Sequence, residues 1–264
     1  MNQDGFDRQM KYLFSPKLAE FDFMGYLYHT QRRLRRVGVS LGLNLQTLRK
    51  ALELNTDVLM VHNAPEELKS GGIYGKMRVV AEKANLSIYR IHLPLDFGKG
   101  GLIDCLCNLL GFQGKPAELN YNGVFISGGV YLIEKRLKFE ELIERVRKIN
   151  PASLRVAGKI RSSFKKIAIT TGDGCKPEFL DQLRPDVFIC GLLNQEAERI
   201  ARDLNITIIE ATSYATENEP LKFVFRRLEK VFKNLQLEFI DIGDSLSLIK
   251  SREGFLYEGG EERI

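Results

Sequence analysis

Short apolar segments typical of strands alternate with amphipathic segments typical of helices along almost the whole chain, and this alternation restricts the fold more than any other feature. It favours sheets whose faces are covered by helices. The 264 residues, 44% of them apolar, are enough for one large domain or for two smaller ones. The predicted fold class is therefore α/β, with two α/β domains whose mixed sheets are flanked by helices.

The expected elements follow from periodicity and from turn residues. Helices are expected at 6–14, 45–54, 74–84, 102–110, 139–148, 178–183 and 195–204, with a last long helix after residue 210. Strands are expected at 37–41, 57–61, 87–91, 154–156, 166–170, 186–190, 206–210 and 235–240. A hairpin is expected where 124–126 and 130–133 flank Ser127-Gly128-Gly129. Thr216 and Glu219 have the spacing of a capping box, with Pro220 in the first turn.

A boundary between two domains is expected near residue 114. Gly111 and the polar stretch 113–116, which ends in proline, interrupt the alternation as a helix stop does. The prediction is an N-terminal α/β domain at 1–114 and a second α/β domain at 115–264. The segment 213–217 of the second domain is expected to return to a site that the two domains share.

Three polar segments follow predicted strands and point to one site. They are Val61-His62-Asn63, His92-Leu93-Pro94-Leu95-Asp96 and Ser213-Tyr214-Ala215-Thr216-Glu217. Polar side chains beyond the carboxyl ends of sheet strands form the usual ligand pocket of such folds. A metal ion or a phosphate group is the expected ligand.

Composition excludes several classes of protein. The longest apolar runs reach about six to eight residues, far below the roughly 20 that a membrane span needs, and the N-terminus lacks the layout of a signal peptide. We therefore expect a cytoplasmic protein with no membrane partner. Four cysteines lack the paired spacing of a structural zinc site and are interpreted as buried filler: Cys105, Cys107, Cys175 and Cys190. The formal charge of +5 permits an anionic partner without requiring one.

Several motifs together resemble the Ngg-interacting-factor-three family, whose bacterial members are also called dinuclear metal centre proteins or GTP cyclohydrolase I type 2 homologues. The matching stretches are 57–65 (DVLMVHNAP), 89–96 (YRIHLPLD) and 211–217 (ATSYATE). Residues 21–25 (FDFMG) stand where the family has a tryptophan-aspartate-asparagine stretch ending in glycine, and 239–241 (FID) resemble its closing strand. The most specific of these motifs is H-x-P-L-D after a strand.

The resemblance implies two metal ions at the domain junction. Carried over by position, the ligands are His62, Asn63, Asp96, Ser213 and Glu217. Asn63 and Ser213 stand where the family has histidines, so both ions lose an imidazole. The resulting sets are Asn63/Asp96/Glu217, whose oxygen ligands suit magnesium, manganese or calcium, and His62/Ser213/Glu217, in which a neutral hydroxyl binds poorly. We expect one weakly held divalent ion or none. The sequence does not distinguish among magnesium, manganese, zinc and iron.

The function implied by the resemblance is metal-dependent hydrolysis of a nucleotide or related phosphorylated compound, at an altered and weakened metal site. Two alternatives remain open: a non-catalytic binding or regulatory oligomer that has lost the metal site, and a nucleic-acid-associated protein. The nucleic-acid alternative rests on two groups of basic residues. They are Arg32, Arg33, Arg35 and Arg36, and Arg226, Arg227, Lys230 and Lys233 of the last helix. The resemblance also implies a homohexamer and a small-molecule ligand.

Several of the polar residues and turns can also be explained by a purely structural role. His92 is interpreted as supporting a ligand or the fold rather than binding metal, and His29 as structural or solvent-facing. Asp96 and Glu217 would favour helix starts by charge alone. The glycine-rich turns 98–101 and 172–176 could hold an anion, although ordinary tight turns are the commoner explanation.

Overall fold

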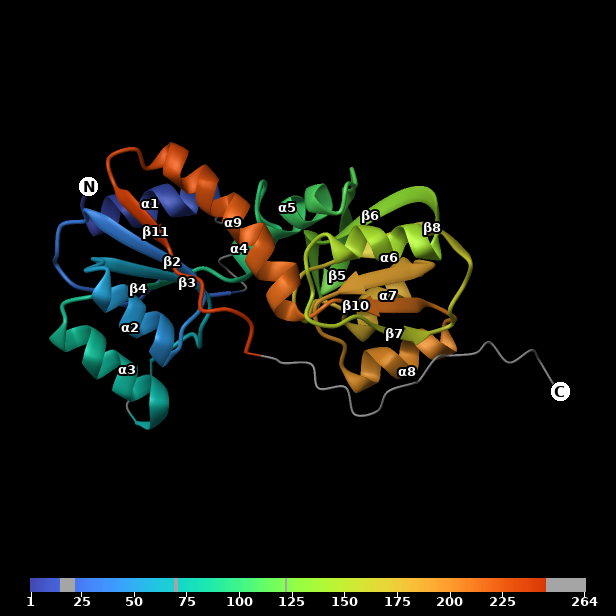
Figure 1. The fold of residues 1–264 in the computed structure, drawn as a ribbon, viewed down its shortest axis with the longest axis horizontal. Helices are drawn as coiled ribbons and strands as arrows, with labels where there is room; N and C mark the ends of the chain where they lie inside the picture. Colours follow the sequence, from blue (N-terminus) through green and yellow to red (C-terminus); the bar gives the residue numbers. More distant parts are fainter. Residues whose placement is uncertain (15–21, 69–70, 122, 246–264) are drawn as a thin grey trace.

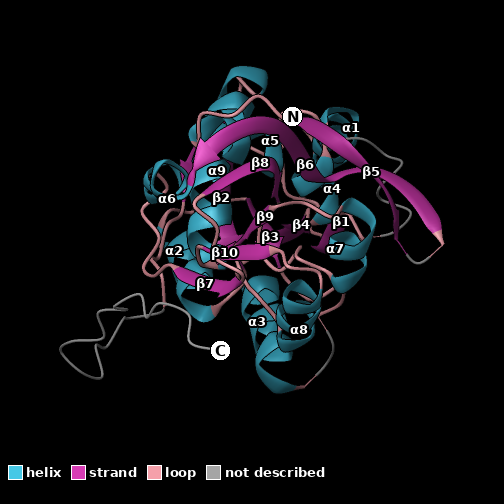
Figure 2. Ribbon diagram, turned by 90° about the vertical axis from the view of Figure 1, so that its right-hand side faces the viewer, coloured by secondary structure: helices cyan, strands magenta, loops and turns pink. Residues whose placement is uncertain are grey.

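The computed structural model describes residues 1–14, 22–68, 71–121 and 123–245, which form two mixed sheets with helices on their faces (Figures 1 and 2). This confirms the predicted fold class. The helices are α1 (Gln3–Leu13), α2 (Leu45–Glu53), α3 (Gly72–Lys83), α4 (Leu93–Phe97), α5 (Leu102–Leu109), α6 (Phe139–Arg147), α7 (Pro177–Leu183), α8 (Gln195–Asp203) and α9 (Ser213–Val231). In the described residues no helix is long and apolar enough to cross a membrane.

The first sheet has the strand order β1-β4-β3-β2-β11. Its strands are β1 (Gly25–Tyr28), β2 (Arg36–Gly42), β3 (Val58–Asn63), β4 (Ser87–Arg90) and β11 (Gln236–Phe239). Neighbours from β4 to β11 pair in parallel, and β1 pairs with β4 antiparallel. The strands β3 and β4 are buried almost throughout, as expected for parallel strands that helices cover on both faces.

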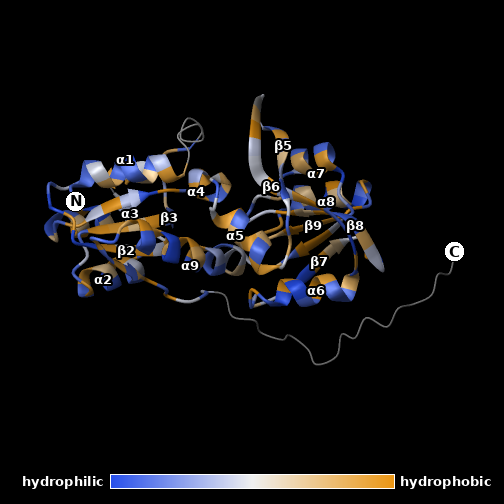
Figure 3. Ribbon diagram, turned by 90° about the horizontal axis from the view of Figure 1, so that it is seen from above, coloured by the Kyte–Doolittle hydropathy of each residue, from blue (hydrophilic) through white to orange (hydrophobic). Residues whose placement is uncertain are grey.

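The second sheet has the strand order β5-β6-β8-β9-β10-β7. Its strands are β5 (Lys115–Tyr121), β6 (Val124–Lys138), β7 (Arg155–Gly158), β8 (Ser163–Ile169), β9 (Val187–Cys190) and β10 (Thr207–Glu210). The central strands β8, β9 and β10 run parallel; β6 and β7 pair with them antiparallel on the two sides, and β5 pairs antiparallel with β6. Figure 3 shows hydrophobic residues gathered along the central strands of both sheets.

The long helix α9 contributes to both cores. Near its start Ala215 packs into the core of the second sheet, whereas Leu221, Val224 and Leu228 pack into the core of the first. The chain then continues into β11, which pairs with β2 of the first sheet. The predicted boundary at residue 114 lies directly before β5, the first strand of the second sheet. The last strand, β11, belongs to the first sheet again. The division into two domains therefore stays a prediction.

Two local predictions were wrong. No hairpin turn lies at Gly128-Gly129, because β6 is one continuous strand and pairs with β5 through Tyr121 and Val124. Both glycines have positive φ, and a Cβ at Gly129 would lie 2.7 Å from the ring of Phe97. These glycines therefore permit close approach of a neighbouring ring, which is the other common reason for glycine inside a strand.

The predicted capping box at Thr216 was also wrong. Helix α9 begins four residues earlier, where the Thr212 side chain accepts a hydrogen bond from the backbone N–H of Ala215. The Thr216 hydroxyl instead donates to the carbonyl of Thr212 at 3.0 Å. Pro220 lies inside the helix, where it removes one backbone donor. The earlier start adds one full turn, so that Ser213 and Glu217 lie one above the other.

Candidate metal centre

His62 is held with one ring nitrogen facing the candidate site. It lies near the end of β3 and is fully buried, and its Nδ1 is 3.0 Å from the carbonyl oxygen of Ile91. Because a carbonyl can only accept, Nδ1 carries the proton and Nε2 keeps a free lone pair. Nε2 lies 3.5 Å from Oδ2 of Asp96 and, among the described residues, has no hydrogen-bond partner. Burial lowers the pKa of His62 to about 4, so the ring is neutral.

His92 is oriented in the same way by a buried carboxylate. Its Nδ1 lies 3.1 Å from Oδ2 of Asp22, which also accepts from the backbone N–H of Leu93 at 2.8 Å. The other oxygen of Asp22 accepts from the guanidinium of Arg90 at 2.8 Å. Burial alone would raise the pKa of Asp22, but hydrogen bonds from His92, Arg90 and Leu93 outweigh it and lower this pKa to about 2. The ionised Asp22 therefore accepts a hydrogen bond from Nδ1–H of His92 and leaves Nε2 as the ring nitrogen available to a metal. Burial opposes a charge on His92, but the hydrogen bond to Asp22 and the charge of Asp96 outweigh it and raise the pKa of His92.

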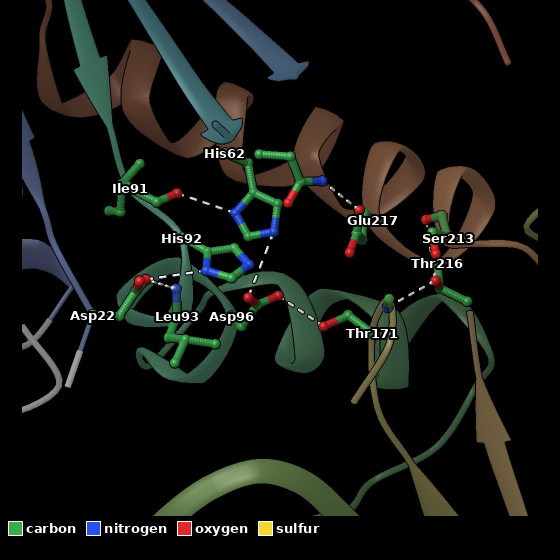
Figure 4. A network of polar contacts seen from close by, with 12 residues as sticks. Asp22, His62, Ile91, His92, Leu93, Asp96, Thr171, Ser213, Thr216 and Glu217 are labelled. Atoms are coloured by element: carbon green, nitrogen blue, oxygen red, sulfur yellow. Dashed lines mark hydrogen bonds and ion pairs between the residues drawn. The ribbon is translucent and has the colours of Figure 1, made fainter. Parts of the chain in front are cut away.

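Asp96 supplies a carboxylate between the two imidazoles. It lies in α4, and its Oδ1 accepts a hydrogen bond of 2.7 Å from the hydroxyl of Thr171, just beyond β8 of the second sheet. Burial raises the pKa of Asp96 to about 7. One ligand atom from each of His62, His92 and Asp96 lies within 4.8 Å of the others, and Figure 4 shows the three side chains converging.

Glu217 stands beside this group on the first turns of α9. Its Oε2 accepts a hydrogen bond of 2.9 Å from the amide of Asn63, and burial raises the pKa of Glu217 to about 7. Its Oε1 lies so close to Gly172 that any Cβ there would overlap with it. Gly172 also has a positive φ, and its N–H donates to Thr216. The glycine-rich turn at 172–176 therefore packs against the candidate site.

Ser213 lies one helical turn before Glu217, farther from the imidazoles (Figure 4). In the described part of the chain no hydrogen bond or ion pair joins it to His62, Asn63, Asp96 or Glu217. It lines, with Asn63 and Glu217, a cavity of about 520 Å³ that does not include His92 or Asp96. A second cavity, of about 220 Å³, is lined by His92, Asp96 and Glu217. Glu217 thus forms part of the wall of both.

Four of the five predicted ligands lie together, and the fifth lies apart from them. The arrangement brings His62, Asn63, Asp96 and Glu217 together, and it places Ser213 at the edge of the group. Asn63 directs its amide N–H, rather than its carbonyl, to Glu217. The amide orientation uses a donor where a metal ligand would need an acceptor.

Three residues of this group have roles that the sequence analysis did not assign to them. His92 was interpreted as a support but offers a ligand atom itself, and Asp22 and Thr171 orient His92 and Asp96. The signal for His92 was present, since it opens the H-x-P-L-D motif directly after a strand. No local pattern marks Thr171, because its role depends on how the second sheet packs against α4. Phe21 of the FDFMG stretch lies outside the described residues.

The donor set fits one divalent ion. Two imidazole nitrogens and one carboxylate oxygen form a set typical of zinc or iron sites, whereas magnesium and calcium prefer oxygen alone. The buried Nε2 of His62, without a hydrogen-bond partner among the described residues, is the atom that most needs such a partner. The second ion of the implied pair does not fit as well, because Asn63 already occupies Oε2 of Glu217.

Some residues of the basic clusters are engaged in contacts within the chain. Arg32 forms an ion pair of 2.7 Å with the buried Asp57, and Arg36 bonds to the carbonyl of Leu54. On α9, Arg227 donates to the carbonyl of Lys99 at 2.7 Å. These contacts supply a structural reason for several of the positive charges. Of the cysteines, Cys107, Cys175 and Cys190 are buried and free, as filler residues would be.

Comparison with known proteins gives concordant matches. The sequence profile of the family described as Duf34/NIF3 (NGG1p interacting factor 3) matches residues 1–245. A protein of Methanocaldococcus jannaschii named GTP cyclohydrolase 1 type 2 homolog is 28% identical over 218 residues, which cover 80% of this chain and 85% of that protein. A similarly named protein of Archaeoglobus fulgidus is also 28% identical, over 81% of this chain and 86% of its own.

The fold is shared with solved structures. The structure described as reduced HcgD from Methanocaldococcus jannaschii matches with a TM-score of 0.76 at 23% identity, over 91% of this chain and 98% of the other. A Bacillus cereus protein described as related to NIF3 matches with a TM-score of 0.77 at 15% identity, over 94% and 99% of the two chains. At these identities the likeness concerns the fold alone.

Proposed function

Because this chain belongs to the Duf34/NIF3 (NGG1p interacting factor 3) family, we propose that it binds one divalent metal ion through His62, His92 and Asp96 and uses it in hydrolysis. The observation that carries the proposal is the fixed orientation of both imidazoles. Their Nδ1 atoms donate to oxygen acceptors, which leaves the two Nε2 atoms as the ligand positions near one carboxylate. The proposed substrate is a nucleotide or a related phosphorylated compound, the class that the relatives' name suggests.

A bound ion of this kind would act as a Lewis acid and would lower the pKa of a coordinated water. The remaining work falls to the chain's own residues. Glu217 is buried with a pKa raised to about 7, near the value that suits a general base at neutral pH. Asn63 fixes Oε2 of that carboxylate, so Glu217 keeps one orientation beside His62. Thr171 and Asp22 hold Asp96 and His92 in place in the same manner.

One observation favours the non-catalytic alternative. The Asn63 amide satisfies Glu217 where the family pattern has a histidine, so the second ion of a two-metal hydrolase has no complete ligand set. A binding or regulatory protein would need the fold and a ligand pocket, but no second ion. The nucleic-acid alternative rests on arginines that are partly engaged in packing. A homohexamer and a cytoplasmic location remain part of the proposal.

Metal analysis tests the proposal directly. Protein purified without a histidine tag is loaded in turn with zinc, manganese and magnesium, dialysed, and analysed by mass spectrometry. We expect close to one zinc or manganese ion per chain, loss of the ion in Asp96→Asn, and its retention in Ser213→Ala, which serves as the matched control. Equal metal content in wild type and Asp96→Asn would contradict the assignment.

Activity on nucleotides separates the two functions. If the loaded protein hydrolyses a nucleotide and Glu217→Gln, with metal still bound, does not, the hydrolase proposal stands. If metal is bound and no phosphorylated ring compound is turned over, the binding or regulatory function is the better description.

A further inference from the structure

The cavity of about 220 Å³ beside His92 and Asp96 differs in character from the metal centre itself. Beyond these two residues its walls include four aromatic or aliphatic side chains, Phe97, Tyr121, Ile126 and Phe179, together with the charged residues Asp173, Lys176 and Glu217. The rings of Tyr121 and Phe179 lie 5.6 Å apart between centroids and are tilted by 58°. Such walls bury flat apolar surface well.

Glycine and threonine residues keep this cavity open and its wall apolar. Gly128 and Gly129 lie against Phe97, which leaves room for its ring. The carbonyl of Gly129 accepts a hydrogen bond of 2.7 Å from the hydroxyl of Thr170, so two polar groups of the lining satisfy each other. A ligand in this cavity therefore meets polar groups at the end where His92 and Asp96 lie and at the ion pair of Lys176 with Asp173.

Charge further limits the ligand. Asp96 and Glu217 lie at the polar end and would balance the two charges of a bound ion. Lys176, also part of the lining, forms an ion pair of 2.9 Å with Asp173. The lining has no spare positive charge among these residues, which makes it a poor site for a phosphate group and a suitable one for a neutral ligand.

We propose that this cavity binds one neutral planar heteroaromatic ring system, monocyclic or fused bicyclic, whose exocyclic oxygen (here called the ring oxygen) is directed toward His92 and Asp96. Its volume lies below the roughly 300–1,000 Å³ of pockets for drug-sized ligands, so a single base-sized ring fills it and a sugar or phosphate group stays outside. The inference rests on the proposed function only in that the ion faces the ring oxygen. It narrows the substrate class of that site to compounds that present such a ring.

Saturation-transfer NMR with hypoxanthine, a neutral bicyclic ring with one oxygen, tests this proposal on the zinc-treated wild-type chain. We expect transfer to the ring protons of hypoxanthine and none to δ-valerolactam, a lactam of similar polarity without an aromatic ring. Ile126→Phe fills the cavity and should weaken the transfer by at least about fivefold. Phe125→Leu is the matched control: Phe125 precedes Ile126 on β6 but is 81% exposed, so the transfer should be unchanged.

A second variant keeps the test decisive if Ile126→Phe fails to fold. Tyr121→Ser removes a half-buried ring of the wall, and we expect about fivefold weaker transfer from the lost aromatic contact. Zinc content is measured on the same samples. Zinc bound without transfer to hypoxanthine overturns the ring proposal and leaves the metal centre intact. Transfer without bound zinc supports the ring proposal and overturns the metal assignment. Equal transfer to δ-valerolactam also overturns the ring proposal.

Discussion

At the scale of single residues, the candidate site depends on side chains that are not proposed metal ligands but hold the ligands in place. Asp22 accepts three hydrogen bonds, from His92, Arg90 and the backbone of Leu93, and through them sets the proton on His92. Supporting carboxylates of this kind commonly contribute as much to a metal site as a weak ligand does.

The Asp22→Asn variant tests this role. An amide at this position can direct its N–H toward Nδ1 of His92 and so favour the wrong tautomer. We expect zinc affinity to fall by about 10- to 100-fold, measured by competition with a chromogenic chelator. Asp186→Asn is the control, because Asp186 accepts comparable bonds from Arg161 and from the backbone of Lys165 and Lys166. An equal loss in both variants would indicate general destabilisation.

The buried carboxylate of Glu217 predicts a pH-dependent stability. Its pKa rises from an ordinary value of 4.5 to about 7 in the folded chain, because burial disfavours the charge. Its contribution is therefore most favourable below pH 4.5 and is lost as pH rises through 7. In metal-free protein, Glu217→Gln should raise stability by up to about 3 kcal/mol at pH 8 and change it little at pH 5.

Thermal unfolding followed by circular dichroism at the two pH values, with a chelator present, measures this difference. Glu53→Gln is the control, since Glu53 is exposed and pairs with Lys50 on the same helix. A Glu217→Gln variant that is less stable than wild type at pH 8 would show that the hydrogen bond from Asn63 outweighs the cost of burying the charge.

At the scale of elements, the sequence predicted the regular parts well and the special positions poorly. The parallel strands β3, β4, β9 and β10 were found because continuous apolar runs mark strands buried on both faces. The polar residues after β3 and β4 followed from the same logic. The strand β1 was missed, and so was the continuity of β6. In β6 a glycine pair inside an apolar stretch predicts a turn, and only the fold shows that the ring of Phe97 packs against it.

The same distinction explains the uneven prediction of the site. His62, Asp96 and Glu217 occur at strand ends or helix starts, where the local pattern identifies them. The Asn63 amide contact joins residues 154 positions apart, and Thr171 meets Asp96 across 75 positions. Neither pairing is encoded by local spacing; both arise from how α4 and α9 pack beside the two sheets.

The glycine pair in β6 gives a prediction at this scale. Gly129→Ala adds a methyl group 2.7 Å from the Phe97 ring at a φ of +75°. We expect a loss of about 2–4 kcal/mol, from backbone strain and overpacking together. Gly123→Ala is the matched control, because Gly123 has a φ of +82° but nothing within 4 Å of the added methyl. Urea unfolding of both variants separates the two effects; equal losses would mean that the Phe97 contact contributes nothing.

At the scale of the whole molecule, α9 joins the two halves. It carries Glu217 near its start, supports the core of the first sheet farther along, and leads into β11. Contacts such as that of Asp96 with Thr171 tie residues beyond the first sheet to residues beyond the second. We therefore expect the two sheets to unfold together rather than as separate units.

Assembly is the prediction that belongs to this scale. The family resemblance implies a homohexamer, so light scattering coupled to size exclusion should give about six times the chain mass of 30.1 kDa. The measurement is made with and without zinc at the same protein concentration. A mass equal to one chain under both conditions would remove the hexamer from the proposed function.

The hydrogen bonds around the candidate centre bear on when the proposed ion would bind. His62, His92, Asp96 and Glu217 are each anchored by a partner from the chain itself: Ile91, Asp22, Thr171 and Asn63. A centre built in this way takes its shape during folding and does not wait for the metal. We expect newly made chains to mature normally under metal starvation and to be loaded afterwards, as the supply recovers.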